Sequence, residues 1–401
     1  MIQTLKNQDT NLDFITASKK DIIDSITLED VKNFLESLGV TQIMVNKEKQ
    51  YLVCPTICHN PINEAESMKL YWYQNNKRSL PWREGWNPYY VWISEVMLQQ
   101  TRIDSVIPYY LRFIHNVPNI EALSLIDEDN LLKLWEGLGY YSRARNLKRA
   151  ACLIMEKFNG VFPSNYEDIL SLPGVGEYTA GAIASICFSL KEVCIDGNVM
   201  RVFTRIMNYD WDISDKNNKN IVKSEIKKIL PDNPGDFNQG IMELGETICL
   251  PNGIPKCHEC PLKYYCLAFL NGNSSLIPRK IKSKSKIEEE YTIFLLIYND
   301  KVAIRKRETG LLKNMWEFPN KQGFLTYDQI IKEFPCNQLI ELGITYTHIF
   351  SHKKWFMNSY YIELTNYIDS FVWVSLDEIY STYALPGAFQ PFLKYLEEKI
   401  K

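Results

Sequence analysis

The spacing of hydrophobic and polar positions changes along this chain. Between residues 67 and 270, apolar residues recur every three or four positions, which is the period of amphipathic helices. Short polar or glycine-containing stretches separate the segments, so this region is predicted to be all α-helical. The predicted helices are Glu64–Gln74, Tyr89–Arg102, Pro108–Asn116, Leu131–Glu136, Ser142–Phe158, Tyr166–Leu172, Glu177–Ser189, Val199–Met207, Lys219–Leu230 and Asp236–Cys249.

From Tyr291 onward the period falls to two, which is typical of half-buried strands. Asn299-Asp300 separates the first two strands and suits a tight hairpin turn. The predicted elements here are strands at Thr292–Tyr298, Val302–Lys306, Ile344–Phe350 and Phe356–Thr365, then helices at Leu376–Tyr383 and Pro391–Lys399. The last part of the chain is therefore predicted to be an α+β domain.

The two remaining regions are polar. Residues 1–66 contain one helical pattern, Leu28–Leu38, and a possible short hairpin at Gln42–Met44 and Gln50–Val53. Residues 271–290 are rich in lysine and turn-forming residues, which indicates a basic linker. The expected organisation is an N-terminal extension of unknown role at 1–66, a helical core at 67–270, a linker at 271–290 and an α+β domain at 291–401.

Composition narrows the class of protein without identifying a partner. Of 401 residues, 46% are hydrophobic and 23% are charged, as in ordinary globular proteins, and the formal net charge is −3. No apolar stretch is long enough to span a bilayer, and the polar N-terminus does not resemble a signal peptide. A cytoplasmic protein with no membrane partner is the expectation. The net charge does not exclude DNA binding, which needs only a local basic face.

Four cysteines lie close together in the sequence. Cys249, Cys257, Cys260 and Cys266 follow the spacing C-x7-C-x2-C-x5-C. Four thiolates in one short loop suit either a tetrahedral zinc ion or an iron–sulfur cluster. The spacing alone leaves both possibilities open.

A glycine-containing turn and an aspartate precede the cysteines. Gly174 and Gly176, in Leu172–Gly176, allow a tight hairpin whose backbone N–H groups can approach a phosphate. The alternative is a plain turn between helices. Asp196 precedes a helical pattern and suits an N-cap, whose N–H donors help to keep a carboxylate ionised. The alternative is that Asp196 is only a cap.

A glutamate occupies an unusual helical position. The helical neighbours of Glu95 are largely apolar, including Val91, Trp92 and Leu98. A carboxyl on an apolar face has a raised pKa and suits a general acid. By spacing alone, a solvated helix glutamate is the better interpretation.

Together these motifs resemble the endonuclease III superfamily of DNA glycosylases, and within it the MutY-type adenine DNA glycosylases. The order of glycine hairpin, aspartate and four-cysteine loop matches, as does Trp92-Ile-Ser-Glu-Val-Met-Leu-Gln-Gln-Thr101. The resemblance implies an all-α helix-hairpin-helix glycosylase core with an iron–sulfur cluster loop. It also implies that Glu95 protonates the departing adenine and that Asp196 stabilises the sugar cation. The expected cofactor is a 4Fe-4S cluster despite one extra residue in the first cysteine spacing, with zinc as the alternative.

The same resemblance implies a set of substrate and DNA contacts. Tyr178 stands where bifunctional relatives carry a lysine that forms a Schiff base, so a monofunctional enzyme is expected. The residues expected to contact DNA or substrate are Arg78, Trp82, Arg83, Gln100, Thr101, Leu138, Tyr140, Gly174, Gly176, Tyr178, Asn198 and Glu243. For the aromatic residues, core packing is the alternative interpretation.

The C-terminal part resembles the MutT-like, or Nudix-like, lesion-reading domain of the same family. Arg307–Pro319 matches a family motif, whereas the catalytic Nudix box is absent, so nucleotide hydrolysis is disfavoured. Phe350, Ser351 and His352 match a loop that the family uses to recognise 8-oxoguanine. By spacing alone they form a strand end.

The resemblance implies a base-excision-repair enzyme that removes adenine opposite 8-oxoguanine or guanine. Its expected partner is double-stranded DNA with such mispairs, bound by a monomer at the nucleoid. An endonuclease III-like lyase is one alternative, and a non-catalytic iron–sulfur DNA-binding protein is another. Tyr178 disfavours the first, and the two carboxylates Glu95 and Asp196 disfavour the second.

Overall fold

The computed structural model describes residues 3–8, 11–16, 44–46, 51–53, 72–279, 285–334 and 340–400. The chain divides into two compact units, one formed by Met1–Arg78 and Lys191–Lys280, the other by Ser79–Leu190 and Ile281–Lys401.

The described residues of the N-terminal region contribute two short antiparallel strand pairs to the first unit. Strands β3 (Met44–Asn46) and β4 (Tyr51–Val53) pair antiparallel, close to the predicted positions. Strands β1 (Gln3–Gln8) and β2 (Asn11–Thr16) also pair antiparallel and were not predicted. The predicted helix Leu28–Leu38 lies outside the described residues, as does Glu64–Gln74 except for its last residues, which are helical.

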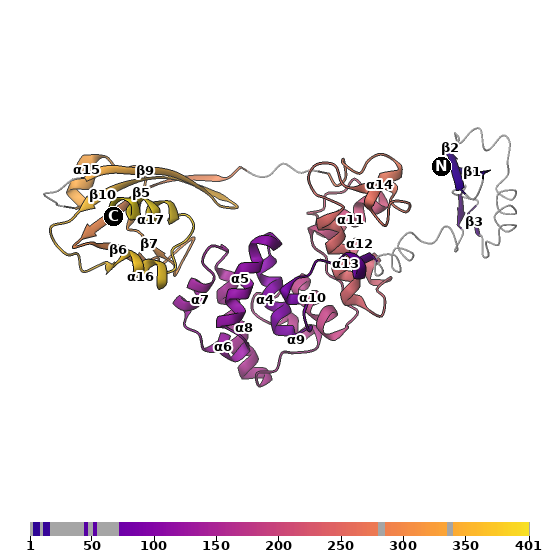
Figure 1. Cartoon of the computed structure of the whole chain (residues 1–401), viewed down its shortest axis with the longest axis horizontal. Helices are drawn as coiled ribbons and strands as arrows, with labels where there is room; N and C mark the ends of the chain where they lie inside the picture. Colours follow the sequence, from indigo (N-terminus) through magenta and orange to yellow (C-terminus); the bar gives the residue numbers. More distant parts are fainter. Residues whose placement is uncertain are drawn as a thin grey trace. The chain divides into compact units, whose positions relative to one another are not determined.

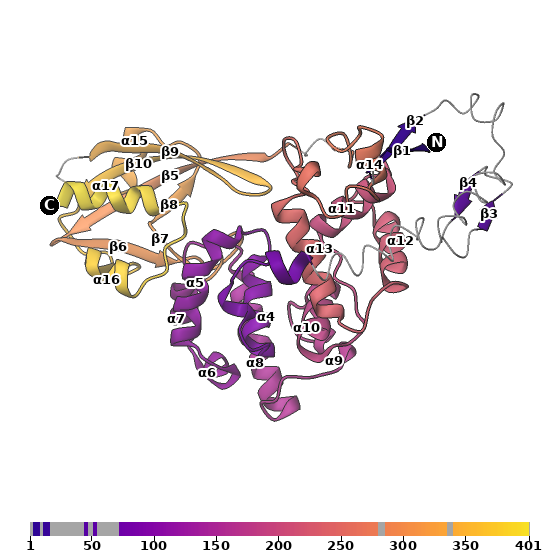
Figure 2. The ribbon, with the colours of Figure 1, turned by 45° about the vertical axis from the view of Figure 1, so that its right-hand side comes forward.

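The rest of the first unit is helical. Helices α11, α12 and α13 lie side by side in both ribbon views (Figures 1 and 2). Their core is built from branched and aromatic side chains, with Phe237 and Val222 fully buried. The elements are α11 (Gly197–Met207), α12 (Lys216–Lys227), α13 (Pro234–Thr247), the 3-10 turn η2 (Cys257–Glu259) and α14 (Leu267–Leu270).

The second unit begins with a helical part. Its core contains Trp92 and Trp135, and Phe113 packs edge-on against Trp135 with ring centroids 5.8 Å apart. The elements are η1 (Pro81–Arg83), α4 (Pro88–Leu98), α5 (Ile103–Asn116), α6 (Ile120–Leu125), α7 (Glu128–Leu134), α8 (Ser142–Phe158), α9 (Tyr166–Leu170) and α10 (Glu177–Phe188).

The second unit ends with a mixed sheet and three helices (Figure 1). Its strand order is β11-β6-β5-β10-β9, with β7 paired to β6 and β8 paired to β5; β10 runs parallel to β5 and the other pairs are antiparallel. Apolar residues of α17 pack on the sheet. The bounds are β5 (Ile287–Tyr298), β6 (Lys301–Lys306), β7 (Trp316–Glu317), β8 (Asn320–Gln322), α15 (Tyr327–Glu333), β9 (Ile340–Ile349), β10 (Lys353–Glu363), β11 (Val372–Val374), α16 (Leu376–Ser381) and α17 (Gln390–Ile400).

Local sequence signals explain many of these boundaries. Several helices begin at an asparagine or aspartate whose side chain accepts a backbone N–H of the first turn, which satisfies an otherwise unpaired donor. These caps are Asn87, Asn119, Asp127, Asn165, Asp196, Asp215 and Asn233. Asn299 and Asp300 both have positive φ, as the predicted tight hairpin requires. The predicted architecture, an all-α core followed by an α+β domain, is confirmed.

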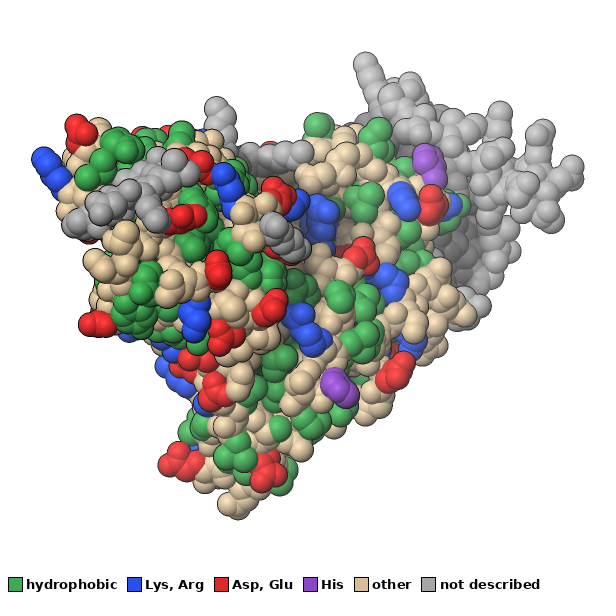
Figure 3. Space-filling model, turned by 60° about the vertical axis from the view of Figure 1, so that its left-hand side comes forward, with side chains coloured by type: hydrophobic (Ala, Val, Ile, Leu, Met, Phe, Trp, Pro, Cys, Tyr) green, Lys and Arg blue, Asp and Glu red, His purple; other side chains and the backbone are tan. Residues whose placement is uncertain are grey.

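The surface agrees with the near-neutral composition. On the described part of the face in Figure 3, lysine and arginine side chains are interspersed with aspartate and glutamate. None of the described helices is both long enough and apolar enough to cross a bilayer.

Candidate active site

Glu95 lies on α4, which packs against α10 in the helical part of the second unit. Only 7% of its surface is exposed, and its helix also buries Trp92 and Val96. Burial raises the pKa of the nearby Cys187 thiol to about 12, and the charge of Glu95 adds to that shift. The structure therefore places Glu95 on a buried helix face, where sequence alone favoured a solvated residue.

Asp196 is the N-cap of α11 in the first unit. One carboxylate oxygen accepts the backbone N–H of Val199, and the other accepts the side-chain amide of Asn198, both at 2.8 Å. Burial raises the pKa of Asp196, while these hydrogen bonds and the charge of Arg201 oppose that rise. We expected the capping contacts to dominate and favour ionisation; instead burial outweighs them, because the carboxyl lies deeper than a surface cap.

Arg201 connects this cap to the cysteine loop. Its guanidinium donates to the side-chain oxygen of Asn198 and to the backbone carbonyl of Cys249, each at 2.8 Å. Gly245 on α13 lies directly against Asn198, where an added Cβ would come within 2.7 Å of the Asn198 Cβ. Glycine is therefore needed for the close approach of α11 and α13, and the candidate residue Asn198 is held from two sides.

The four predicted metal ligands lie near one another. Cys249 follows α13, Cys257 begins η2, and Cys266 is the N-cap of α14. Burial raises the pKa of Cys260 to about 12 and that of Cys266 to about 11, and the neighbouring cysteines contribute in both cases. Four half-buried thiols this close together need a nearby cation to be stable as thiolates.

A backbone hydrogen bond spans the segment that contains the extra residue of this loop. The Lys256 N–H donates to the Ile248 carbonyl at 2.9 Å, which closes the segment that contains the insertion. Gly253 within it adopts a positive φ of 76°. As placed, no three His, Cys, Asp or Glu side chains of the described residues form a group that holds a metal ion. The chemistry of the four thiols nevertheless fits a thiolate-ligated metal centre.

The predicted glycine hairpin connects α9 to α10. Gly174 has a φ of 78°, and a Cβ there would approach Asn146 to 2.6 Å, so only glycine fits. Gly176 is the N-cap of α10, with space around it. Tyr178 lies half-buried in the first turn of α10. The hairpin therefore presents a helix N-terminus, as the phosphate-binding interpretation requires.

Two other predicted DNA contacts lie at exposed, left-handed positions. Gln100, just after α4, is exposed and has a φ of 59°. Tyr140, just before α8, is 45% exposed and has a φ of 47°. Thr101 is half-buried beside Gln100, whereas the Leu138 side chain is buried in the helical core. Gln100 and Tyr140 are thus the members of this group best able to reach a ligand.

Arg78 and Glu243 form an ion pair within the first unit. Nε of Arg78 lies 2.5 Å from one Glu243 oxygen, and Nη2 lies 3.2 Å from the other. Nη2 also donates to Glu246 at 2.7 Å. Although burial alone lowers the pKa of Arg78, these two glutamates raise it overall. The pair joins the start of the core to α13.

Trp82 and Arg83 lie in η1 of the second unit. Trp82 is buried and packs edge-on against Tyr110, with ring centroids 5.2 Å apart. Arg83 is half-buried. The contacts of Trp82 match the core-packing alternative for this residue.

Phe350, Ser351 and His352 directly follow β9, at the strand end that their spacing predicts, and form the turn to β10. The Phe350 ring packs edge-on against Trp355 at 4.8 Å and against His348 at 4.5 Å. Ser351 and His352 are exposed, and their side chains share a hydrogen bond of 3.1 Å. The turn therefore presents two polar side chains next to a cluster of aromatic rings.

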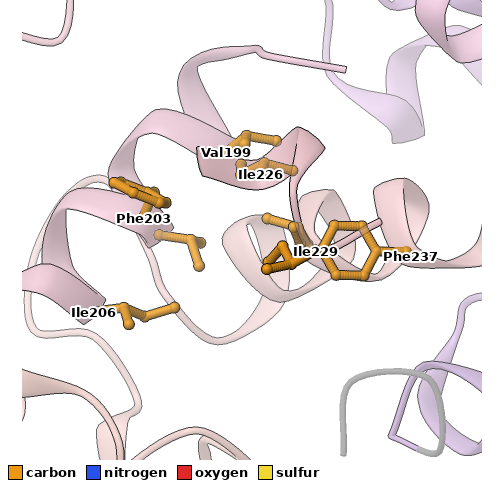
Figure 4. A pocket seen from close by; sticks show the side chains of 8 residues that line it. Val199, Phe203, Ile206, Ile226, Ile229 and Phe237 are labelled. Carbon is orange, nitrogen blue, oxygen red and sulfur yellow. The ribbon is translucent and has the colours of Figure 1, made fainter. Parts of the chain in front are cut away.

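One apolar pocket lies within the first unit, between α11, α12 and α13 (Figure 4). All of its lining side chains are Val, Ile or Phe, so it supplies no polar or titratable group. The lining residues are Val199, Val202, Phe203, Ile206, Ile226, Ile229, Phe237 and Ile241. It is a gap in core packing behind the Asp196 helix.

Sequence reasoning missed three buried arginines: Arg143, Arg201 and Arg205. Arg201 and Arg205 lie four residues apart in an otherwise apolar helical pattern. A charge on the buried face of a helix needs hydrogen-bond partners, so this pattern was a usable signal. Arg143 carried no comparable signal, because its partners are backbone carbonyls of other segments.

The arrangement brings some predicted residues together within each unit. Asp196 joins Asn198, Arg78 joins Glu243, and the four cysteines are neighbours, all in the first unit. Glu95, the glycine hairpin, Gln100 and Tyr140 belong to the second unit.

Comparisons with known proteins agree with this organisation. Residues 93–231 match the HhH-GPD superfamily of base excision DNA repair proteins, and residues 292–395 match the NUDIX domain family. These matches confirm the helix-hairpin-helix core and the Nudix-like domain.

Relatives match most of the chain. The adenine DNA glycosylase of Buchnera aphidicola subsp. Baizongia pistaciae is 38% identical over 77% of this chain and 86% of its own length. That of Buchnera aphidicola subsp. Acyrthosiphon pisum is 36% identical over 82% and 95%, and that of Mus musculus is 32% identical over 82% and 73%. The chain therefore belongs to the adenine DNA glycosylase family, within the HhH-GPD superfamily of base excision DNA repair proteins.

Proposed function

We propose that this protein is a monofunctional adenine DNA glycosylase, which hydrolyses the N-glycosidic bond of adenine opposite 8-oxoguanine or guanine in duplex DNA. The observation that carries the proposal is the pair of carboxyls in unlike settings, Glu95 on a buried helix face and Asp196 in a hydrogen-bonded cap. Membership of the adenine DNA glycosylase family supports the choice of base.

Glu95 is assigned the role of general acid. A departing adenine needs a proton on a ring nitrogen, and a carboxyl held in an apolar setting keeps its proton near neutral pH. The base must leave the duplex stack to reach such a buried group.

Asp196 is assigned the stabilisation of the sugar cation. As the bond to adenine breaks, positive charge develops on the sugar, and a nearby carboxylate lowers the energy of that transition state. The hydrogen bonds from Val199 and Asn198 hold this carboxylate in one orientation. Water then adds to the sugar, so the products are free adenine and an abasic site.

Tyr178 supports a monofunctional reaction. Its phenol cannot form the Schiff base through which lyases cleave the DNA backbone. Strand breaks at the abasic site should therefore require alkali.

Cys249, Cys257, Cys260 and Cys266 are assigned as ligands of a 4Fe-4S cluster, with zinc as the alternative. Such a cluster would organise the loop and supply positive charge next to the thiolates, without taking part in base excision. The cysteines contribute four sulfur donors, and Arg201 and Arg205 connect Cys249 to α11.

The partner is double-stranded DNA, bound by a monomer. The glycine hairpin suits a backbone phosphate, and Gln100 and Tyr140 suit insertion into the duplex. The turn at Phe350, Ser351 and His352 suits contact with 8-oxoguanine, since it offers both aromatic rings and polar side chains.

A single-turnover assay tests the proposal. The duplexes carry adenine opposite 8-oxoguanine, adenine opposite thymine, or thymine glycol opposite adenine, and breaks are scored with and without alkali. We expect alkali-dependent breaks only at the mispaired adenine, lost in Glu95→Gln but retained in Glu156→Gln, an exposed residue of α8. Alkali-independent breaks at thymine glycol would indicate a lyase instead. Tight binding without cleavage of any duplex would indicate a non-catalytic DNA-binding protein.

A further inference from the structure

One buried guanidinium joins two separate loops of the second unit. Nη1 of Arg143 donates to the backbone carbonyl of Gln99 at 2.7 Å, and Nη2 donates to that of Gly139 at 3.2 Å. Gln99 immediately precedes Gln100, and Gly139 immediately precedes Tyr140. Each bond therefore fixes the peptide that leads into one of the two exposed residues proposed above to insert into DNA.

Both of these residues have a left-handed backbone conformation that residues other than glycine rarely adopt. Gln100 has a φ of 59° and Tyr140 has a φ of 47°. Such conformations cost on the order of 1–3 kcal/mol each and persist only where surrounding contacts impose them. The Arg143 hydrogen bonds are contacts of this kind, since they act on the adjoining peptides.

Arg143 makes further contacts with the end of α4 and with the Tyr140 ring. Nη1 also donates to the carbonyls of Val96 and Met97, at 2.8 and 3.0 Å, at the C-terminal end of α4. A positive charge is favourable there because the carbonyls at a helix C-terminus carry partial negative charge. The guanidinium carbon also lies 5.5 Å from the centre of the Tyr140 ring.

The planar shape of guanidinium suits this task better than an ammonium group. Its two Nη atoms point toward two loops at once, whereas a lysine would supply one point charge. Arg143 is 8% exposed, and among the described residues it contacts backbone carbonyls and aromatic rings. Such a bridge contributes preorganisation: the two loops are held before DNA arrives.

We propose that Arg143 is a positioning residue that fixes Gln100 and Tyr140 as one preassembled pair for insertion into duplex DNA. The inference rests on the proposed glycosylase function. It assigns Arg143 no contact with the reacting base; Arg143 acts through the two loops. Its loss should therefore impair extrusion of the base more than general binding to DNA.

The test compares Arg143→Lys with the wild type and with Arg149→Ala, an exposed arginine on the same helix. Extrusion is read from the fluorescence of 2-aminopurine placed opposite 8-oxoguanine, and affinity is read from anisotropy with an undamaged duplex. For Arg143→Lys we expect a clearly smaller fluorescence rise, and a single-turnover excision rate about tenfold to a hundredfold lower. Its affinity for undamaged duplex should stay within about twofold, and Arg149→Ala should match the wild type.

A second pair of variants separates positioning from folding. Asparagine tolerates left-handed backbone better than glutamine, so Gln100→Asn should restore part of the fluorescence rise in the Arg143→Lys background. Gly139→Ala strains the other loop, where φ is 70° and a Cβ would meet nothing within 4 Å. It should reduce extrusion with Arg143 intact, even if Arg143→Lys fails to fold.

Three results would overturn the inference. One is wild-type extrusion in both Arg143→Lys and Gly139→Ala. Another is an equal loss of extrusion and undamaged-duplex affinity in folded Arg143→Lys, and a third is wild-type extrusion in Gly139→Ala when Arg143→Lys does not fold. Failure of the wild type to excise adenine would instead refute the proposed function. The fluorescence assay would still report extrusion of the base, and so would still test the role of Arg143.

Discussion

Arg205 donates a hydrogen bond from Nη1 to the Sγ of Cys249 at 3.1 Å. The same side chain also donates to the carbonyls of Leu250 and Ile277, at 2.9 and 2.7 Å. Hydrogen bonds from charged donors are about twice as strong as neutral ones and are most favourable with an anionic acceptor. A buried arginine thus contacts one proposed cluster ligand and joins α11 both to Leu250, at the start of the cysteine loop, and to Ile277, beyond its end.

Removing this arginine should weaken both the loop and the metal centre. Arg205→Met leaves two buried carbonyls without their donor, so we expect the free energy of unfolding to fall by on the order of 3 kcal/mol. Urea denaturation measures this change, and iron per protein chain should fall with it. The matched control is Arg279→Ala, which removes an exposed ion pair with Asp210 and should change stability by less than about 0.5 kcal/mol. An unchanged urea midpoint and iron content in Arg205→Met would contradict the assignment.

Asp196→Asn should separate catalysis from folding. Asparagine is as good an N-cap as aspartate, and the neutral side chain avoids the burial of charge that raises the Asp196 pKa. The contact with the Asn198 amide is lost in exchange, so the free energy of unfolding should stay within about 1 kcal/mol. Excision should fall at least about a hundredfold, because the developing sugar cation loses its counter-charge. A variant that excises normally would exclude Asp196 from the site.

The pH dependence of stability tests the environment of Asp196. The pKa of Asp196 in the folded protein is raised above the ordinary value of 3.8. At pH values between the ordinary pKa and the raised pKa, the folded state therefore binds more protons than the unfolded state. The contribution of Asp196 to stability should therefore fall as pH rises through that window. The urea midpoint of the wild type minus that of Asp196→Asn should decrease from about pH 4 upward and then level off. An increase over the same range would mean that the hydrogen bonds outweigh burial.

The sequence was a good guide wherever local signals decide the structure. The helix predicted at Ser142–Phe158 is found with those bounds, since its apolar period is long and its end coincides with Asn159-Gly160. Asp196 was predicted as an N-cap from its place before an apolar helical pattern, and it is one. These features depend on a few neighbouring residues, so one sequence suffices to find them.

Prediction failed where tertiary contacts determine the structure or where an element is very short. The helix predicted at Pro108–Asn116 begins at Ile103, so Pro108 lies inside the helix and not at its start. Helix α6 (Ile120–Leu125) is too short to show a period. The burial that raises the Asp196 pKa comes from the packing of distant segments, so the cap motif alone suggested the opposite direction.

The glycine hairpin gives a matched pair of substitutions two residues apart. Gly174→Ala combines a positive φ of 78° with a Cβ only 2.6 Å from the Asn146 Cβ, so either the hairpin or α8 must shift. We expect a loss of about 1–3 kcal/mol in the free energy of unfolding and weaker binding of any duplex, with a lower salt dependence as phosphate contacts are lost. Gly176→Ala places its Cβ in open space at an ordinary φ of −100° and should cost about 0.5 kcal/mol. Urea denaturation and anisotropy at two salt concentrations measure both variants. If Gly174→Ala binds duplex DNA as tightly as Gly176→Ala does, with the same salt slope, the hairpin is only a helix connection and the phosphate contact must lie elsewhere.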